Sequence, residues 1–142
     1  MKIQRITHEN LDTLCELENL CAYHPWSRDA LRSTLEHHTT WGILGLNPDP
    51  AGYILTQRVL DEVEILTLGV HPRQRRRGVA TTLLRSAHNT WRTEGVKTGF
   101  LEVREQNLAA IQLYLQHGWT QVGRRANYYG PSKHALNLCW TP

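Results

Sequence analysis

The stretch at residues 70–84 constrains the fold more than any other part of the chain. It follows an apolar run and reads V-H-P-R-Q-R-R-R-G-V-A-T-T-L-L. Pro72 has no N–H to donate to a sheet, so it ends the strand before it. A helical pattern then begins near Gly78. The first turn of a helix has free N–H groups and the positive end of the helix dipole, so this stretch predicts a phosphate site between a strand and a helix.

Small and basic residues gather in this loop. Gly78 and Ala80 have little or no side chain, so a ligand can approach the backbone closely. Arg73 and residues 75–77 add positive charge at the same place. A basic run is also typical of a solvated surface or a nucleic-acid patch. Here the charges are concentrated in one loop and not spread between aromatic residues, so we expect no nucleic-acid partner.

Length and composition set the broad class. The chain has 142 residues, of which 40% are apolar and 20% charged, with a net charge of +3. These values are typical of a globular protein with one core, so we expect a single domain over residues 1–142. No run approaches the roughly 18 apolar residues of a membrane-spanning helix, and the first residues lack the apolar core of a signal peptide. We therefore expect a cytoplasmic protein without a membrane partner.

Cysteines and histidines form no recognisable ligand pattern. The three cysteines, Cys15, Cys21 and Cys139, include no C-x-x-C pair, which predicts reduced thiols. The eight histidines are scattered and lack the H-x-x-x-H and H-E-x-x-H spacings. No metal site is therefore expected.

Periodicity and turn residues predict an α/β fold with a mixed central sheet of about seven strands and about four helices. Strands are expected at residues 2–6, 39–46, 51–60, 62–70, 97–104, 119–125 and 135–140. Helices are expected at residues 8–21, 28–35, 78–94 and 108–117. A turn is expected at residues 47–50. The fourth strand connects through a helix to the fifth, which requires a parallel pair after a mostly antiparallel run.

Several local features follow from single residues. Ser27 and Asn107 are expected to cap the helices that follow them. In the last helix, Leu108, Ile111 and Leu115 are expected to face the core. Gly69, near the end of the fourth strand, suggests a bulge or a close backbone approach.

The element order, with R-x-x-G-x-A opening a helix after the fourth strand, resembles the GNAT family of acetyl-CoA-dependent N-acetyltransferases. The resemblance covers essentially the whole chain, and residues 75–80 fit the family's pyrophosphate signature. It implies a sheet that is splayed between strands 4 and 5, and acetyl-CoA as co-substrate. The residues implied to bind it are Leu68, Gly69, Val70, Arg75, Arg76, Arg77, Gly78, Val79, Ala80, Thr81 and Asn107.

Five shorter segments resemble the branch of that family that acetylates the N-terminal alanine of a small-subunit ribosomal protein. They are residues 24–27, 59–62, 101–104, 107–114 and 124–129. The resemblance implies Glu102 as general base, Tyr114 as general acid, and an acceptor groove at Trp26, Tyr128 and Tyr129. The chain departs from the pattern at Ala126 and at residues 130–134, so the acceptor is less constrained than the chemistry.

Three carboxylates compete for the role of base. Glu102 lies within an otherwise apolar strand, a setting that favours a raised carboxyl pKa. Tyr114 comes seven residues after Asn107, so both project from one helix face. Glu64 ranks second, because many GNAT enzymes place their base near this point, and Glu62 ranks third. The alternative for Glu102 is a surface charge in a cross-strand pair.

The leading expectation is direct acetyl transfer, in a ternary complex, to the α-amine of a protein N-terminus. The nearest alternative is a GNAT enzyme for a lysine side chain, a polyamine or an antibiotic. A third possibility is a non-catalytic module that binds acetyl-CoA and docks a partner. The presence of both Glu102 and Tyr114 argues against that module. A small RNA-binding domain is a distant fourth.

Overall fold

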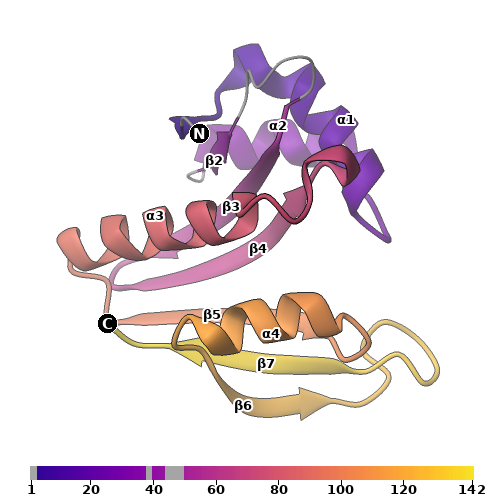
Figure 1. The fold of residues 1–142 in the computed structure, drawn as a ribbon, viewed down its shortest axis with the longest axis vertical. Coiled ribbons are helices and arrows are strands. Elements are labelled where there is room, and N and C mark those ends of the chain that lie inside the picture. The colour runs from indigo at the N-terminus through magenta and orange to yellow at the C-terminus, as the bar shows by residue number, and fades with distance from the viewer. Residues whose placement is uncertain (1–2, 38–39, 44–49) are drawn as a thin grey trace.

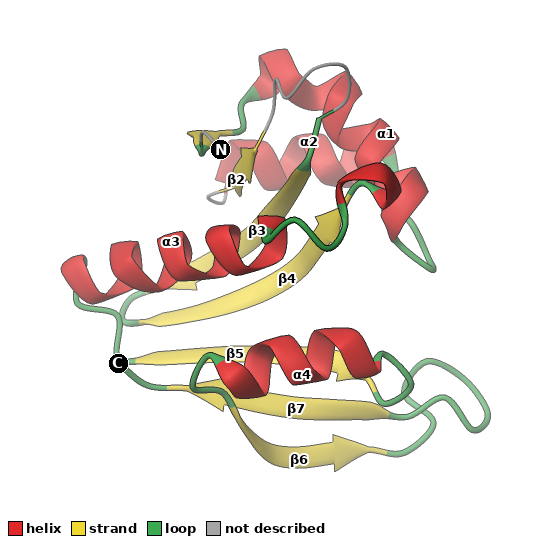
Figure 2. Ribbon diagram, in the orientation of Figure 1, coloured by secondary structure: helices red, strands yellow, loops and turns green. Residues whose placement is uncertain are grey.

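The computed structural model describes residues 3–37, 40–43 and 50–142. These residues form one mixed sheet with the strand order β1-β2-β3-β4-β5-β7-β6 (Figures 1 and 2). Its strands are β1 (Gln4–Arg5), β2 (Thr40–Ile43), β3 (Gly52–Val59), β4 (Glu62–Val70), β5 (Thr98–Arg104), β6 (Thr120–Arg125) and β7 (Ala135–Trp140). The helices are η1 (His8–Asn10), α1 (Leu11–Cys21), α2 (Arg28–His37), η2 (Pro72–Gln74), α3 (Val79–Thr93) and α4 (Leu108–Gln116).

The predicted α/β architecture with four α-helices is confirmed in the described part of the chain. The sheet itself is carried by β3 to β7, which have between six and nine residues each. The strands β1 and β2 are short additions of two and four residues. The parallel pair is β4 with β5, and all other pairs are antiparallel, as the crossover requires.

The sheet opens between β4 and β5. Their parallel register covers three residue pairs, the last being Glu64 with Phe100. Beyond that point β4 pairs with β3 alone as far as Val70. The register between β3 and β4 also shifts, so that Leu66 is an extra residue on β4 and forms a β-bulge. Beyond Glu64 and Phe100, β4 and β5 diverge toward their carboxyl ends (Figure 1).

The helices cover both faces of the first half of the sheet. Tyr53 belongs to a core that includes Leu14 of α1 and Leu31 of α2. The adjacent Ile54 belongs to a second core, which includes Leu83 of α3. Adjacent side chains of a strand point to opposite faces, so α1 and α2 lie on one face and α3 lies on the other.

The orientation of α4 differs from the prediction. Leu108 is 73% exposed and Leu115 is 50% exposed, so the expectation that they face the core is wrong. Ile111 packs against the core as expected, together with the buried Tyr114. Apolar residues occur all round this helix, so their pattern does not single out one face. The burial of the large Tyr114 ring sets the orientation instead.

Two predicted helix caps are confirmed. The side-chain oxygen of Ser27 accepts a hydrogen bond from the Ala30 N–H at 3.1 Å. Asn107 Oδ1 accepts one from the Ala110 N–H at 3.2 Å. Each bond satisfies an N–H that has no partner within the helix, which fixes where α2 and α4 begin.

Parts of three predictions lie outside the described residues. These are the first residue of the strand predicted at residues 2–6, the ends of the strand predicted at residues 39–46 and most of the turn predicted at residues 47–50. Within the described ranges, no helix is long and apolar enough to cross a membrane.

Candidate active site

Two cavities open where β4 and β5 separate. The first, here called the sheet cavity, has a volume of about 410 Å³ and lies beside the separated ends of β4 and β5. The second, the loop cavity, has a volume of about 640 Å³ and lies along the loop before α3. Both are lined by the same five residues at their junction: Cys21, Leu68, Asn107, Ala110 and Tyr114. The two cavities therefore meet between Leu68 of β4 and the face of α4 that carries Ala110 and Tyr114.

The loop cavity collects nearly all of the residues that the sequence predicted for acetyl-CoA. Those that line it are Leu68, Gly69, Val70, Arg75, Arg76, Gly78, Val79, Ala80, Thr81 and Asn107. Arg77 is the exception, since its guanidinium donates to Gln74 Oε1 at 3.2 Å and the residue does not line the cavity. Arg77 therefore supports the loop through Gln74 and does not face the ligand space.

Gly78 places the first turn of α3 against the loop cavity. It is the N-cap residue and has φ 77° and ψ 15°, a left-handed conformation that favours glycine. No side chain caps this helix, and the first intrahelical bond runs from the Thr82 N–H to the Gly78 carbonyl at 3.0 Å. The N–H groups of residues 79–81 precede that bond and lack a helical partner. These amides, with the positive end of the helix dipole, suit an anion such as pyrophosphate.

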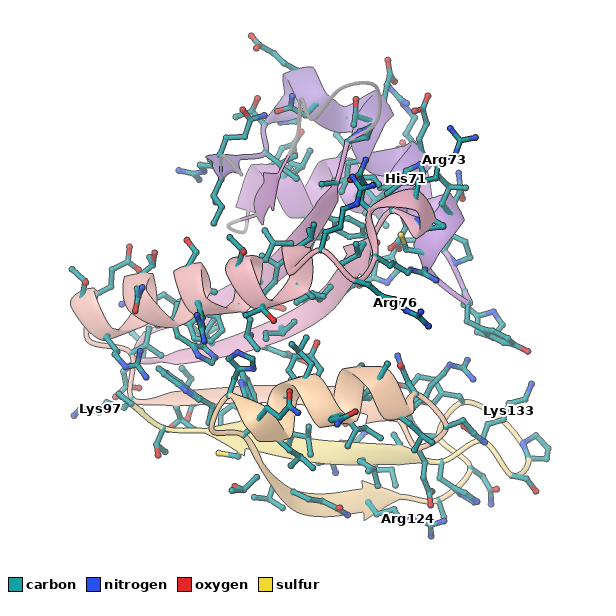
Figure 3. All side chains as sticks on the ribbon, in the orientation of Figure 1. His71, Arg73, Arg76, Lys97, Arg124 and Lys133 are labelled. Carbon is teal, nitrogen blue, oxygen red and sulfur yellow. The ribbon has the colours of Figure 1, made fainter. Side chains whose placement is uncertain are left out.

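Two arginines extend the positive charge of this site. Arg75 donates from Nε to the Val70 carbonyl at 3.2 Å, which ties the loop to the end of β4. Arg76 has φ 62°, an uncommon conformation for a residue with a side chain. Figure 3 shows Arg76 reaching from the loop toward the side of the molecule that carries β5 and α4. Its guanidinium is therefore placed beside the loop cavity.

Close packing by the Tyr53 ring, and not a bulge, requires a glycine at position 69. A Cβ added to Gly69 would lie 2.7 Å from Cε1 of Tyr53 and 3.0 Å from Cβ of Cys21. Tyr53 is the residue opposite Gly69 in the register of β3 and β4. The Tyr53 ring therefore occupies the space of a Gly69 side chain, and the bulge lies at Leu66 instead.

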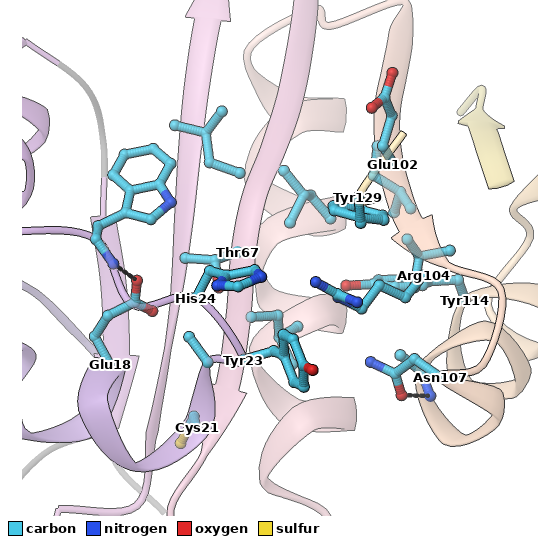
Figure 4. A pocket seen from close by; sticks show the side chains of 18 residues that line it. Glu18, Cys21, Tyr23, His24, Thr67, Glu102, Arg104, Asn107, Tyr114 and Tyr129 are labelled. Carbon is cyan, nitrogen blue, oxygen red and sulfur yellow. Dashed lines mark hydrogen bonds between the residues drawn. The ribbon is translucent and has the colours of Figure 1, made fainter. Parts of the chain in front are cut away.

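Glu102 lines the sheet cavity from β5 (Figure 4). Its side chain is 25% exposed, and Oε1 lies 3.3 Å from Arg125 Nε. The neighbouring Leu101 and Val103 are buried in the core. Strand residues alternate between faces, so these apolar neighbours point away from Glu102. The apolar setting expected for this carboxylate is therefore wrong, and a charged partner is present instead.

Tyr114 lies at the junction of the two cavities. Its side chain is buried, and burial raises the pKa of its hydroxyl well above the usual range. The hydroxyl makes no hydrogen bond to any side chain or carbonyl within the described ranges. A phenol in this state stays protonated at neutral pH and is free to donate its proton to a ligand.

The competing carboxylates lie apart from this junction. Glu64 and Glu62 line a separate small cavity of about 110 Å³ and not the sheet cavity. Burial, and then the negative charge of Glu102, raise the pKa of Glu64. Of the three carboxylates considered as base, Glu102 is the one that lines the sheet cavity.

Two of the three acceptor residues predicted from the sequence line the sheet cavity, and the third does not. Trp26 and Tyr129 line the sheet cavity, but Tyr128 does not. The Tyr128 ring is half-exposed, 5.0 Å from the Tyr129 ring, and near the Arg125 guanidinium. Tyr128 therefore supports Tyr129 from outside the cavity.

Glu18 was not among the predicted site residues. It is 1% exposed and lines the sheet cavity. Its Oε1 accepts from the Tyr53 hydroxyl at 2.5 Å. Its Oε2 accepts from the Trp26 N–H at 2.9 Å (Figure 4). This carboxylate fixes the segment after α1 against the sheet. The available signal was its spacing, since Glu18 lies four residues after Leu14 on the buried face of α1.

A stack of three side chains, here called the tyrosine–arginine stack, joins both sides of the sheet cavity. The Arg104 guanidinium lies 4.2 Å from the centre of the Tyr23 ring and 4.4 Å from that of Tyr129. Tyr23 follows α1, whereas Tyr129 lies between β6 and β7. Lys133 Nζ also lies 3.5 Å from the Tyr23 hydroxyl. These contacts connect three segments that are far apart in the sequence.

Comparisons with known proteins agree with this geometry. Residues 11–119 match the model of the acetyltransferase (GNAT) family. The chain is 33% identical over 130 residues to ribosomal protein bS18-alanine N-acetyltransferase of Escherichia coli (strain K12), covering 84% of this chain and 88% of that relative. A putative enzyme of the same name in Bacillus subtilis (strain 168) is 27% identical over 140 residues, covering 97% and 93%.

The fold is similar to a solved structure as well. The crystal structure of ribosomal-protein-S18-alanine N-acetyltransferase from Escherichia coli matches with a TM-score of 0.92 and 29% identity, over 99% of this chain and 92% of that one. The family match spans most of the chain and includes both the strand before the basic loop and the helix after it. This chain belongs to the acetyltransferase (GNAT) family.

Proposed function

We propose that this enzyme transfers the acetyl group of acetyl-CoA to the α-amine of a protein N-terminus. By similarity to the relatives described above, the acceptor is the N-terminal alanine of ribosomal protein bS18. One observation carries the proposal: a cavity suited to a pyrophosphate meets a second cavity at Tyr114, with Glu102 facing the second. Donor and acceptor can therefore approach each other from two directions.

The loop cavity fits acetyl-CoA on the features described above. The uncapped amides of residues 79–81 and the guanidinium groups of Arg75 and Arg76 suit its pyrophosphate. Beyond Glu64, one edge of β4 has no partner strand. Backbone groups of residues 68–70, apart from the Val70 carbonyl that Arg75 and Cys21 occupy, are then available to bind the pantetheine arm like an added strand.

Proton transfers fall to Glu102 and Tyr114. The amine nitrogen forms a bond to the acetyl carbon while the carbon–sulfur bond breaks. Glu102 accepts the proton that the amine loses, and Arg125 lies beside its carboxylate, with Nε 3.3 Å from Oε1. Tyr114, whose pKa is raised by burial, donates its proton to the departing sulfur. A backbone N–H of residues 68–70 is the donor for the charge that develops on the carbonyl oxygen.

The acceptor enters through the sheet cavity. Its walls are Trp26, held by Glu18, and Tyr129, held by the tyrosine–arginine stack. A volume of about 410 Å³ accommodates the first residues of an extended peptide and excludes a folded surface. A free N-terminus can enter such a cavity, and the similarity to the bS18-alanine N-acetyltransferases favours it over a lysine side chain.

The test is acetyl-CoA turnover against a peptide panel. Peptides with the bS18 N-terminal sequence, and variants that begin with serine, glycine or methionine, are compared with an N-blocked peptide and a lysine peptide. We expect the highest kcat/KM for a free N-terminal alanine and none after blocking. Turnover with lysine or small amines alone would instead favour the alternative acceptor classes.

A further inference from the structure

A third cavity lies on α3, away from the cleft between β4 and β5. It has a volume of about 300 Å³ and is lined by Arg85, His88, Asn89, Arg92 and His117. It shares none of these lining residues with the sheet cavity or the loop cavity. No carboxylate occurs among the described residues that line it, whereas two arginines and two histidines do. The composition of this wall is that of a site for an anion.

His88 supplies a donor that the protein itself leaves unused. The residue is only 4% exposed, and its Nε2 lies 3.0 Å from Trp119 Nε1. An indole nitrogen only donates, so Nε2 is the acceptor and Nδ1 carries the hydrogen. Burial, with the charges of Arg92 and His117, lowers the pKa of His88 to about 4, so this neutral tautomer holds at pH 7.

The Nδ1–H of His88 is available to a ligand. It makes no hydrogen bond to the residues that the structure describes. The Nδ1 atom is also not fully buried. In the described part of the chain, the fully buried side-chain atoms that lack a partner comprise Asn137 Oδ1 alone. A donor that is accessible, unused and on a cavity wall points to a ligand with acceptor atoms.

The two arginines carry charge that no carboxylate balances. Neither Arg85 nor Arg92 pairs with an acidic side chain within the described ranges. They are seven residues apart, so they lie two turns apart on one face of α3. The Arg92 guanidinium packs 5.4 Å from the centre of the Trp140 ring, which holds it near His88. Arg85 and Arg92 are both exposed, and two cations at one cavity repel each other until an anion binds between them.

His117 adds to the same cavity from the residue that follows α4. Its Nδ1 lies 2.8 Å from the Leu113 carbonyl, so Nδ1 donates there. This hydrogen bond orients the His117 ring at the wall of the cavity.

We propose that this cavity binds a phosphate group, either as free phosphate or as the monoester of a small metabolite. Arg85 and Arg92 provide charge-assisted hydrogen bonds, and the Nδ1–H of His88 provides a neutral one. The volume is at the small end of ligand pockets, which suits a phosphate or a short phosphomonoester. This site is separate from the acetyl-transfer cleft and does not depend on the proposed acceptor.

The test is a titration of the full chain followed by two-dimensional NMR of the tryptophan indole N–H groups. The Trp119 indole is hydrogen-bonded to His88, so its signal reports on this cavity. Inorganic phosphate and glycerol phosphate are added separately, with coenzyme A present in excess to fill the loop cavity. We expect a saturable shift of the Trp119 signal with at least one of them, and competition by sulfate but not by chloride at equal ionic strength.

Matched variants assign the site. Arg85→Gln should weaken binding by about tenfold and Arg92→Gln by at least as much, because each removes a charge-assisted bond. Arg32→Gln is the control, since Arg32 is an exposed cation on α2 paired with Asp29, and it should change nothing. Arg85→Gln is the more decisive variant. Arg92 packs on Trp140, so its substitution also removes a packing contact, whereas that of Arg85 does not affect Trp140.

The outcomes separate clearly. A shift that chloride reproduces, or that Arg85→Gln leaves unchanged, overturns the proposal. The absence of any saturable shift at millimolar phosphate and glycerol phosphate does the same. Saturation by free phosphate alone, or by the ester alone, identifies which source the site accepts.

Discussion

The loop cavity and the sheet cavity meet at Tyr114 but are built differently. The loop cavity rests on backbone: the left-handed Gly78, the uncapped first turn of α3 and the unpaired edge of β4. The sheet cavity rests on side chains from distant segments, held by Glu18 and by the tyrosine–arginine stack. A backbone site depends on few side-chain identities, whereas a side-chain site changes with each of them. The difference suits a fixed cofactor on one side and a variable acceptor on the other.

The largest effect is expected in the sheet cavity, at the proposed general base. Glu102→Gln should lower kcat by about 10²-fold or more, the usual size for a general base, with little change in KM for acetyl-CoA. The matched variant is Glu64→Gln, which removes a carboxylate on the neighbouring strand outside the sheet cavity. Steady-state kinetics of both variants decide the assignment. Near-normal turnover of Glu102→Gln together with loss in Glu64→Gln would move the base to β4.

The backbone character of the loop cavity predicts the next effect. Gly78→Ala should raise KM for acetyl-CoA about tenfold, because the new methyl group projects into open space beside the α3 amides. Gly95→Ala is a closely matched control, since Gly78 has φ 77° and Gly95 has φ 78°. Both changes should cost about 1–2 kcal/mol of unfolding free energy. An equal effect of the two variants on KM would show that strain, not ligand contact, is responsible.

Glu18 tests whether side chains hold the acceptor side. Glu18→Gln weakens the anchor of the Trp26 segment, and we expect KM for the acceptor peptide to rise about fivefold, a change near 1 kcal/mol. KM for acetyl-CoA should stay the same, since Glu18 does not line the loop cavity.

The control for Glu18 is Tyr53→Phe. It removes the other hydrogen bond to Glu18 and leaves the bond to the Trp26 N–H in place. Chemical denaturation should show a loss of about 1–3 kcal/mol in both variants. If Tyr53→Phe raises the acceptor KM as much as Glu18→Gln, the effect comes from lost stability and not from the position of Trp26.

The smallest effect separates two adjacent tyrosines. Tyr129→Leu removes a ring that lines the sheet cavity and stacks on Arg104, so the acceptor KM should rise about threefold. Tyr128→Leu should have less effect, because Tyr128 lies outside the cavity. Comparison of kcat/KM for the two variants with one peptide tests this. A larger loss for Tyr128→Leu would place the acceptor on the outer face of the loop.

The difference between a local loop and contacts between distant segments also explains which features could be predicted from the sequence. The loop before α3 is local, so Pro72, Gly78 and the basic run were enough to place it. Glu18 and Arg104 were not singled out, because the tyrosines that they contact lie far away in sequence and only the fold brings them together. The role of Glu102 was assigned by resemblance, but its expected apolar setting was wrong. Alternation turns Leu101 and Val103 to the opposite face, and Arg125 of β6 lies beside Glu102.

Errors in α4 and at Gly69 have similar causes. The face of α4 could not be derived from a helix that is apolar all round, and Leu108 was misplaced as a result. At Gly69, a glycine in a strand indicated a bulge or a close approach, and the close approach is that of the Tyr53 ring. The bulge at Leu66 arises from the register of two strands, which no single residue reveals.

The central claim is that the two cavities are arms of one active site. The most direct test is the affinity of a bisubstrate ligand, in which coenzyme A is joined covalently to the α-amine of an alanine peptide. If the arms meet at Tyr114, calorimetry should show this ligand binding at least about 10²-fold more tightly than coenzyme A, because the second contact becomes intramolecular. An affinity equal to that of coenzyme A alone would contradict the account.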